Sequence, residues 1–159
     1  MGLYLGKRVQ PDMNKPCGES FWREKTLAEM TAEEWESLCD GCGQCCLKKF
    51  IDDDTDEILS TQVACELLDG HTCRCCDYNN RHSKVPECVV LTPEIILTIA
   101  WIPESCAYRV LAEGRELAWW HPLVSGNPET VHLAGKSVRD RTIPAGHVHP
   151  DDLQEYVTG

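Results

Sequence analysis

The sequence has no long hydrophobic run. Its 159 residues contain nothing close to the roughly 18–20 consecutive apolar residues that cross a membrane as a helix, which excludes a membrane-spanning protein. Residues 1–10 lack the apolar run of a secretory signal, and Gly6 stands where a myristoylation signal has serine or threonine. We therefore expect a soluble cytoplasmic protein with no membrane partner.

Basic residues are also scarce. The chain has 15 lysines and arginines against 26 aspartates and glutamates, and its net charge is −11 with the histidines neutral. Such a chain repels phosphate backbones, and metal-bound thiolates would make it more negative still. We therefore expect no nucleic-acid partner.

Cysteine, by contrast, is abundant. Eleven cysteines are present, and eight of them lie between Cys39 and Cys76. Residues 39–46 read Cys-Asp-Gly-Cys-Gly-Gln-Cys-Cys, so that Gly41 and Gly43 separate three cysteines spaced three residues apart. Glycine supplies the positive φ angles of a tight turn, and thiolates are soft ligands that suit zinc, copper(I) and iron–sulfur clusters. The run predicts a metal site.

Disulfide bonds are the alternative role for these thiols. Adjacent pairs such as Cys45 and Cys46, or Cys75 and Cys76, are poorly placed for a disulfide bond. The Cα atoms of a disulfide lie further apart than neighbouring residues in one strand or helix usually allow. An odd number of cysteines and a reducing compartment also argue against a disulfide framework. Metal ligation is the favoured interpretation.

Local signals in the first half predict short elements. Thr31-Ala-Glu-Glu34 has the pattern of a capping box and predicts a helix that ends near Cys39. The acidic run 52–57 lacks the glycine and distal glutamate of an EF-hand, which favours a solvated turn. Residues 58–65 predict a strand that delivers Cys65 to the cluster.

The second half gives weaker signals. Thr92-Pro93-Glu94 predicts the start of an apolar helix over residues 95–101, and a second helix is predicted over 104–113 with Gly114 as its cap. The spacing of Cys73 and Cys75 predicts an extended segment with both sulfurs on one side. Loops with one strand around 137–139 are expected further on.

Together these signals predict an α+β fold. We expect one small metal-stabilised domain in which short helices and loops surround a cysteine cluster, with little sheet. The cysteine-cluster domain should cover residues 21–126, after a loosely structured segment 1–20 and before a C-terminal extension 127–159 packed on it or flanking it.

At these residues the chain resembles the YcgN-type CxxCxxCC family of bacterial cysteine-cluster proteins, whose members are described as zinc- or iron-chelating. The likeness runs from about Phe21 to Gly126, and its most specific part is Leu38–Leu47. The resemblance implies nine metal ligands, which are Cys39, Cys42, Cys45, Cys46, Cys65, Cys73, Cys75, Cys88 and Cys106. Cys17 and Cys76 fall outside this pattern, and the resemblance assigns no role to His147 and His149.

The nature of the metal stays open between zinc and an iron–sulfur cluster. Two four-cysteine zinc sites would leave one of nine thiolates over, whereas a polynuclear zinc cluster with bridging thiolates would use them all. The trio Cys39, Cys42 and Cys45 also resembles the ferredoxin run, although the proline that usually follows its remote cysteine is missing. Three functions follow as alternatives: a zinc-stabilised module that binds a protein partner, an iron–sulfur redox protein or sensor, and metal delivery or storage.

Other side chains are candidates for supporting roles around the metal. Tyr108 and Arg109 could donate hydrogen bonds to sulfurs or pair with acids, and His121 could serve as a base or a ligand, although packing in an aromatic corner is favoured for it. His71 and His82 are candidate ligands of a mixed site. Hydrolytic catalysis ranks below the other functions, and no residue is assigned to catalysis.

Overall fold

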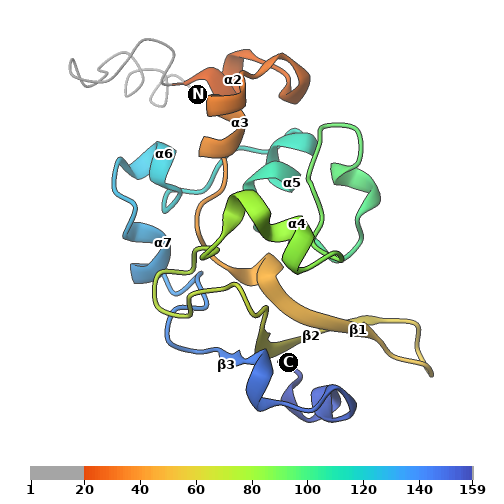
Figure 1. Cartoon of the computed structure of the whole chain (residues 1–159). Coiled ribbons are helices and arrows are strands. Elements are labelled where there is room, and N and C mark those ends of the chain that lie inside the picture. Colours follow the sequence, from red (N-terminus) through yellow and green to blue (C-terminus); the bar gives the residue numbers. More distant parts are fainter. Residues whose placement is uncertain (1–19, 159) are drawn as a thin grey trace.

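The computed structural model describes residues 20–158 and has an α+β fold built from short elements (Figure 1). The predicted fold class and its small sheet are confirmed. Residues 1–19, which include Cys17 and almost all of the segment expected to be loosely structured, lie outside the described residues. The α-helices are α2 (Phe21–Glu24), α3 (Ala32–Ser37), α4 (Arg81–Lys84), α5 (Ala107–Ala112), α6 (Pro122–Ser125) and α7 (Thr130–Leu133). The 3-10 helices are η1 (Leu27–Glu29), η2 (Gln44–Cys46), η3 (Tyr78–Asn80), η4 (Ile96–Thr98), η5 (Ala145–His147) and η6 (Pro150–Tyr156).

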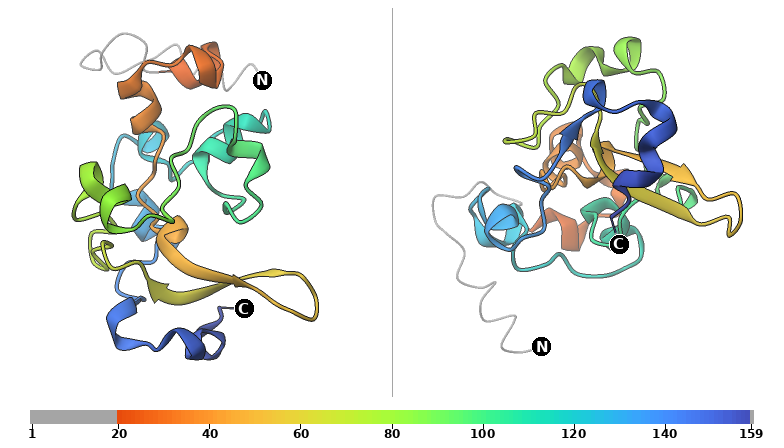
Figure 2. Two further views of the ribbon diagram at one scale, coloured as in Figure 1. Left: turned by 45° about the vertical axis from the view of Figure 1, so that its right-hand side comes forward. Right: turned by 90° about the horizontal axis from the view of Figure 1, so that it is seen from below.

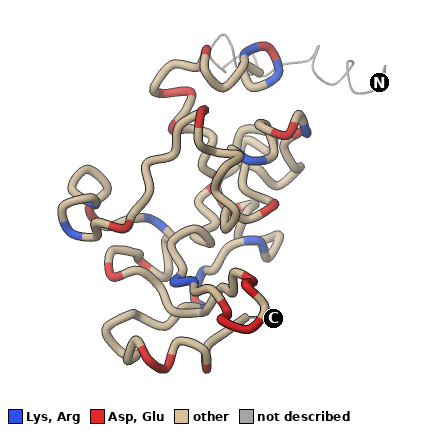
Figure 3. The backbone as a smooth tube through the Cα atoms, turned by 90° about the vertical axis from the view of Figure 1, so that its right-hand side faces the viewer, with Lys and Arg blue, Asp and Glu red and all other residues tan. Residues whose placement is uncertain are grey.

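The sheet has three strands in the order β1-β2-β3. The strand β1 (Leu47–Ile51) pairs antiparallel with β2 (Ile58–Ala64), which pairs in parallel with β3 (Ile143–Pro144). The β1–β2 hairpin projects from the rest of the molecule, and the predicted acidic turn forms its tip (Figures 2 and 3). Because β1 follows η2 directly, the sheet fixes the position of the cysteine run.

The main hydrophobic core lies between the N-terminal helices and α5. Phe21, Trp22 and Leu38 pack there against Ile102 and Val110. A second, smaller cluster contains a cysteine of the run, because Cys42 packs with Trp120 and Val131. The cysteine run therefore begins at one core and continues into the other.

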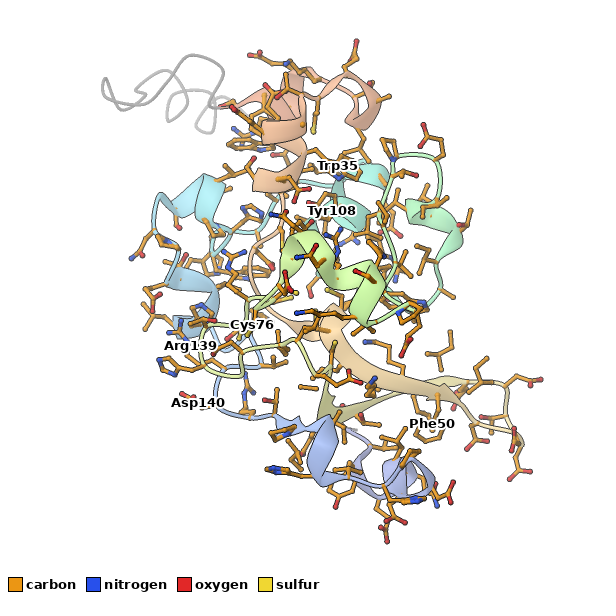
Figure 4. The ribbon with its side chains drawn as sticks, in the orientation of Figure 1. Trp35, Phe50, Cys76, Tyr108, Arg139 and Asp140 are labelled. Atoms are coloured by element: carbon orange, nitrogen blue, oxygen red, sulfur yellow. The ribbon has the colours of Figure 1, made fainter. Side chains whose placement is uncertain are left out.

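The capping box at Thr31 forms as predicted. The Thr31 hydroxyl accepts from the Glu34 amide at 3.1 Å, and the Glu34 carboxylate accepts from the Thr31 amide at 2.8 Å. On the next turn Trp35 packs against Tyr108, with ring centroids 4.7 Å apart, and the Tyr108 hydroxyl donates to the Trp35 carbonyl at 2.7 Å (Figure 4). These contacts join α3 to α5 directly beside Cys39.

Three local predictions are wrong. Residues 95–101 contain only the single turn η4, because Ile99 already has an extended backbone that stops the helix. Residues 137–139 form no strand; Ser137 is buried and its hydroxyl bonds to His132, while the strand of this region is β3. Cys73 is not extended, since its φ of 60° is in the left-handed region. Of these outcomes, the pairing of β3 with β2 depends on residues about eighty positions apart in the sequence.

Two further predictions differ in detail. The helix predicted over 104–113 forms only at α5, with Cys106 as its N-cap and Gly114 at φ 76° beyond its end. The tail contains α7 and η6 besides loops, and β3 lies beside β2. The division of the chain after residue 126 stays a prediction. Among residues 20–158 no helix has the length and apolar character to cross a membrane.

Candidate metal centre

The run 39–46 forms a compact turn between α3 and β1. Gly41 and Gly43 have φ angles of 78° and 76°, the left-handed values predicted from their spacing. Gly43 also has no room for a side chain, because a Cβ there would lie 2.8 Å from Val138 Cγ2 and 3.3 Å from Cys73 Cβ. The turn is further tied to the C-terminal part of the chain by the Val138 amide, which donates to the Cys42 carbonyl at 2.9 Å.

Four of the predicted ligands gather around this turn. Cys39 is an exposed residue, but burial of its sulfur, together with the charge of Cys45, raises its pKa to about 11. Burial also raises the pKa of Cys42 well above its usual value. Burial raises the pKa of Cys106 to about 11, and the charge of Cys45 adds to this shift. The sulfurs are thus close enough to act on one another, although Cys106 lies far from the run in the sequence.

A buried carboxylate lies among these thiols. Asp40 is 5% exposed, its Oδ1 accepts from the Cys42 amide at 2.9 Å, and its charge raises the pKa of Cys39, Cys42, Cys45 and Cys106. Within residues 20–158 no lysine, arginine or histidine forms an ion pair with Asp40. Burying a carboxylate without a cation is costly, so the surroundings of Asp40 suit a metal ion.

Backbone amides favour the thiolate form of several cysteines. The Gly41 amide opposes the rise in pKa at Cys39, and the Gln44 amide does the same at Cys42. At Cys65, the Leu67 amide donates to Sγ at 3.5 Å. In each case the donor lies two residues after the cysteine. Hydrogen bonds to sulfur are a usual means of stabilising metal-bound thiolates.

A second group of cysteines lines a cavity of about 490 Å³ under the hairpin. Cys45, Cys46, Cys65 and Cys88 share its wall with apolar side chains that include Leu47 and Ile102. The Cys65 amide donates to the Cys46 carbonyl at 2.8 Å, which fixes β2 beside the turn. Cys45 belongs to both groups. A hydrogen bond to Cys46, followed by burial, raises the pKa of Cys45, although the residue keeps an exposed edge in the open cavity.

Cys73 and Cys75 lie on a third segment. The Cys73 sulfur is 3.6 Å from the position that a Gly43 Cβ would occupy, so this buried residue touches the turn. Cys75 is half-buried and forms a backbone bridge with Leu68. Cys76, outside the nine, is exposed. Among residues 20–158 no group of three or more potential ligands already stands in metal-binding geometry.

The three candidate supporting residues are held by other partners. The Tyr108 hydroxyl binds the Trp35 carbonyl, and Arg109 pairs with Glu113 at 3.1 Å and donates to the Ile102 carbonyl at 2.8 Å. Their backbone amides, however, oppose the pKa rise at Cys106. His121, 1% exposed, faces the Leu38 carbonyl through Nε2 at 2.8 Å and accepts from the Leu123 amide through Nδ1 at 3.0 Å.

The other histidines that the sequence singled out lie elsewhere. His71 is exposed and pairs with Asp140 at 3.0 Å, whereas the Nε2 atom of His82 is buried without a described partner. His147 and His149 lie in or next to 3-10 helices of the C-terminal segment.

Sequence reasoning missed two charged residues of the centre. Asp40 was visible inside the run but has no pattern that predicts its burial. Lys49 is partly buried and donates to the carbonyls of Gln44 at 2.9 Å and Leu47 at 2.8 Å. Burial lowers its pKa, while the charges of Cys45, Cys46 and Cys42 oppose that shift. Lys49 is therefore a cation fixed beside the sulfurs.

Comparison with known proteins identifies relatives. Residues 38–107 match the CxxCxxCC family model, described as "Putative zinc- or iron-chelating domain". A UPF0260 protein of Rhizobium etli is 59% identical over 137 residues, which cover 86% of this chain and 87% of that protein. UPF0260 proteins of Sinorhizobium fredii and Sinorhizobium medicae are 58% and 56% identical over 137 residues, covering 86% of this chain and 88% of each relative. No solved structure matches.

Proposed function

Because this chain belongs to the UPF0260 family of CxxCxxCC proteins, we propose that it binds zinc or an iron–sulfur cluster through its nine matched cysteines. The observation that carries the proposal is the gathering of Cys39, Cys42, Cys45 and Cys106 around the buried, unpaired Asp40. As neutral thiols these groups would leave Asp40 without a cation. A metal ion supplies that cation and allows the thiols to ionise.

The donor set fits the metals proposed. Thiolate sulfur is the preferred ligand of zinc in closed sites and of iron in iron–sulfur clusters. The amides that face Cys39, Cys42 and Cys65 stabilise the ionised sulfurs without competing for the metal. Carboxylate- and water-rich sites, which suit magnesium or calcium, have a different composition.

Cys45 connects the two groups of sulfurs. It lies beside Cys39 and Cys106 on one side and lines the cavity with Cys46, Cys65 and Cys88 on the other. This position suits a thiolate that bridges two metal ions better than a thiolate that binds a single isolated metal ion. Cys73 and Cys75 would complete the set of nine from the segment that packs on Gly43. The thiols must move closer together on binding.

The role that follows depends on the metal. With zinc, closed thiolate sites would stabilise a module that meets a protein partner. With iron and sulfide, the cavity beside Cys45 and Cys88 would give a small reactant access to a redox cluster. Both roles need reduced thiols, and the cytoplasm keeps thiols reduced.

Purification without oxygen, followed by metal and acid-labile sulfide analysis, tests the proposal. Broad absorption near roughly 400 nm with bound sulfide would identify an iron–sulfur redox protein, because closed-shell zinc has no such charge transfer. Colourless protein with about two or three zinc ions would identify the zinc-stabilised module. Protein that retains neither metal after reconstitution with each would refute the proposal.

A further inference from the structure

A second, larger cavity lies beside the cysteine turn. Its volume is about 700 Å³, which is within the range of roughly 300–1,000 Å³ typical of small-molecule sites. Its wall combines the start of β1, the outer face of β2, the loop before α5 and the segment 135–142. Unlike the cavity under the hairpin, it contains no cysteine.

The charges on its wall differ from those of the whole chain. The sequence has 15 basic against 26 acidic residues, yet the described residues that line the cavity include Lys49, Lys136 and Arg141 against the single acid Glu104. A local excess of positive charge in an acidic protein concentrates anions at that place.

These three cations also lack carboxylate partners. In residues 20–158, seven lysines and arginines form ion pairs with aspartate or glutamate: Arg23, Lys25, Lys48, Lys84, Arg109, Arg115 and Arg139. Five others form no such pair: Lys49, Arg74, Arg81, Lys136 and Arg141. Three of these five meet at one cavity. Lys49 also lies beside the sulfurs of Cys45 and Cys46, so Lys136 and Arg141 are the cations of this wall with no described acidic neighbour. In a chain with a surplus of acids, such a pair beside Lys49 indicates an anionic ligand.

Two of the cations are held in place and keep unused donors. Lys49 gives two of its three N–H groups to the carbonyls of Gln44 and Leu47, and its ammonium lies 5.2 Å from the centre of the Trp101 ring. Arg141 uses Nη2 to bind the carbonyls of Gly135 and Ser137. Its remaining guanidinium donors can form a fork with an oxyanion.

From these observations we infer that the cavity binds a small anion with at least two negative charges carried by carboxylate or phosphate oxygens. Lys49, Lys136 and Arg141 supply the charge, and hydroxyl groups on the wall, such as those of Ser105 and Thr142, supply neutral hydrogen bonds. Lys49 belongs both to this wall and to the surroundings of Cys45 and Cys46. An anion bound here therefore lies next to the proposed metal centre without contributing a ligand to it.

Calorimetric titration of the full-length, metal-loaded protein tests this inference, with inorganic phosphate and tricarballylate as separate probes. We expect Lys136→Gln and Arg141→Gln each to weaken binding about tenfold, because each removes one charge-assisted contact. Arg81→Gln is the matched control, since Arg81 is also unpaired with a carboxylate but lies outside the cavity. Raising the salt concentration should weaken binding to the parent protein.

The outcomes are distinct. Preference for phosphate would identify a phosphorylated ligand, and preference for tricarballylate a polycarboxylate; either supports the site. The inference is overturned if neither probe binds at millimolar concentration, or if Lys136→Gln binds as tightly as Arg81→Gln. Lys136 makes no described side-chain bond, so its variant tests charge without disturbing Arg141. Metal content, measured for every variant, separates failure at this site from failure of the proposed metal centre.

Discussion

Replacing Gly43 with alanine tests how tightly the cysteine turn is packed. The change has two costs. An L-residue in the left-handed region, where Gly43 has φ 76°, costs roughly 1–2 kcal/mol. The new Cβ would also lie 2.8 Å from Val138 Cγ2 and 3.3 Å from Cys73 Cβ, and relief of such overpacking typically costs about 1–3 kcal/mol.

Gly114→Ala is the matched control. Gly114 has the same φ of 76°, but a Cβ there meets no atom within 4 Å. In both variants alanine lowers the conformational entropy of the unfolded chain, which favours the folded state and offsets about 0.4–1 kcal/mol of the backbone cost. The control should therefore be destabilised by about 0–1.6 kcal/mol, and Gly43→Ala by about 1–3 kcal/mol more than the control.

Urea unfolding of the metal-loaded proteins measures the difference, and metal content should fall only in Gly43→Ala, because Cys73 must move. Equal unfolding midpoints for the two variants would show that Val138 and Cys73 do not crowd the turn. The contact between Cys73 and the turn at Gly43 would then be wrong.

Three further predictions concern the cysteines, the core and a buried histidine. Cys42→Ser should lose metal and solubility together, because Cys42 is buried and a hydroxyl replaces a soft thiolate poorly. Cys76→Ser, at an exposed site, should keep the full metal stoichiometry. Equal losses of metal in the two variants would require a second site that includes Cys75 and Cys76. A strong chelator under reducing conditions should abolish the near-UV circular dichroism of Trp120, which packs on Cys42. The reason is that thiolate zinc sites contribute about 10 kcal/mol to folding. An unchanged spectrum after verified metal removal would rule out a role of the metal in folding. Burial lowers the pKa of His121, so the unfolded chain binds the proton more tightly, and the free energy of unfolding should fall as the pH drops below about 6.5. In His121→Gln the free energy of unfolding should fall less between pH 7 and pH 5. An identical fall in the parent and the variant would show that His121 is not the cause.

The parts of the fold that the sequence predicted depend on neighbouring residues. The capping box needs only Thr31 and Glu34, which lie within one turn. The turn at 39–46 follows from Gly41 and Gly43, whose positive φ angles are local properties. The strand β2 likewise follows from its β-branched composition.

Other parts of the fold do not follow from local patterns. β3 is only two residues long, and its pairing with β2 depends on residues about eighty positions away in the chain. The apolar run 95–101 has the composition of a buried helix, but its chain instead turns at Ile99 after one turn of 3-10 helix. Cys73 has a backbone in the left-handed region, which is uncommon for residues other than glycine and is not predicted from the sequence.

The candidate site shows the same division. The nine cysteines could be named from spacing and resemblance, but their grouping could not. Cys106 comes close to Cys45 and Asp40 because α3 packs on α5, and Cys45 and Cys88 come together only as lining residues of the cavity under the hairpin. The burial of Asp40 and the position of Lys49 also emerge only when these segments meet.

X-ray absorption spectroscopy at the edge of the bound metal tests the central claim most directly. The account predicts a first coordination shell made of sulfur, at about 2.3 Å if the metal is zinc. The signal should be retained in Cys76→Ser and lost with the metal in Cys42→Ser. A first shell of nitrogen and oxygen in the parent protein would contradict the claim that the cysteines hold the metal.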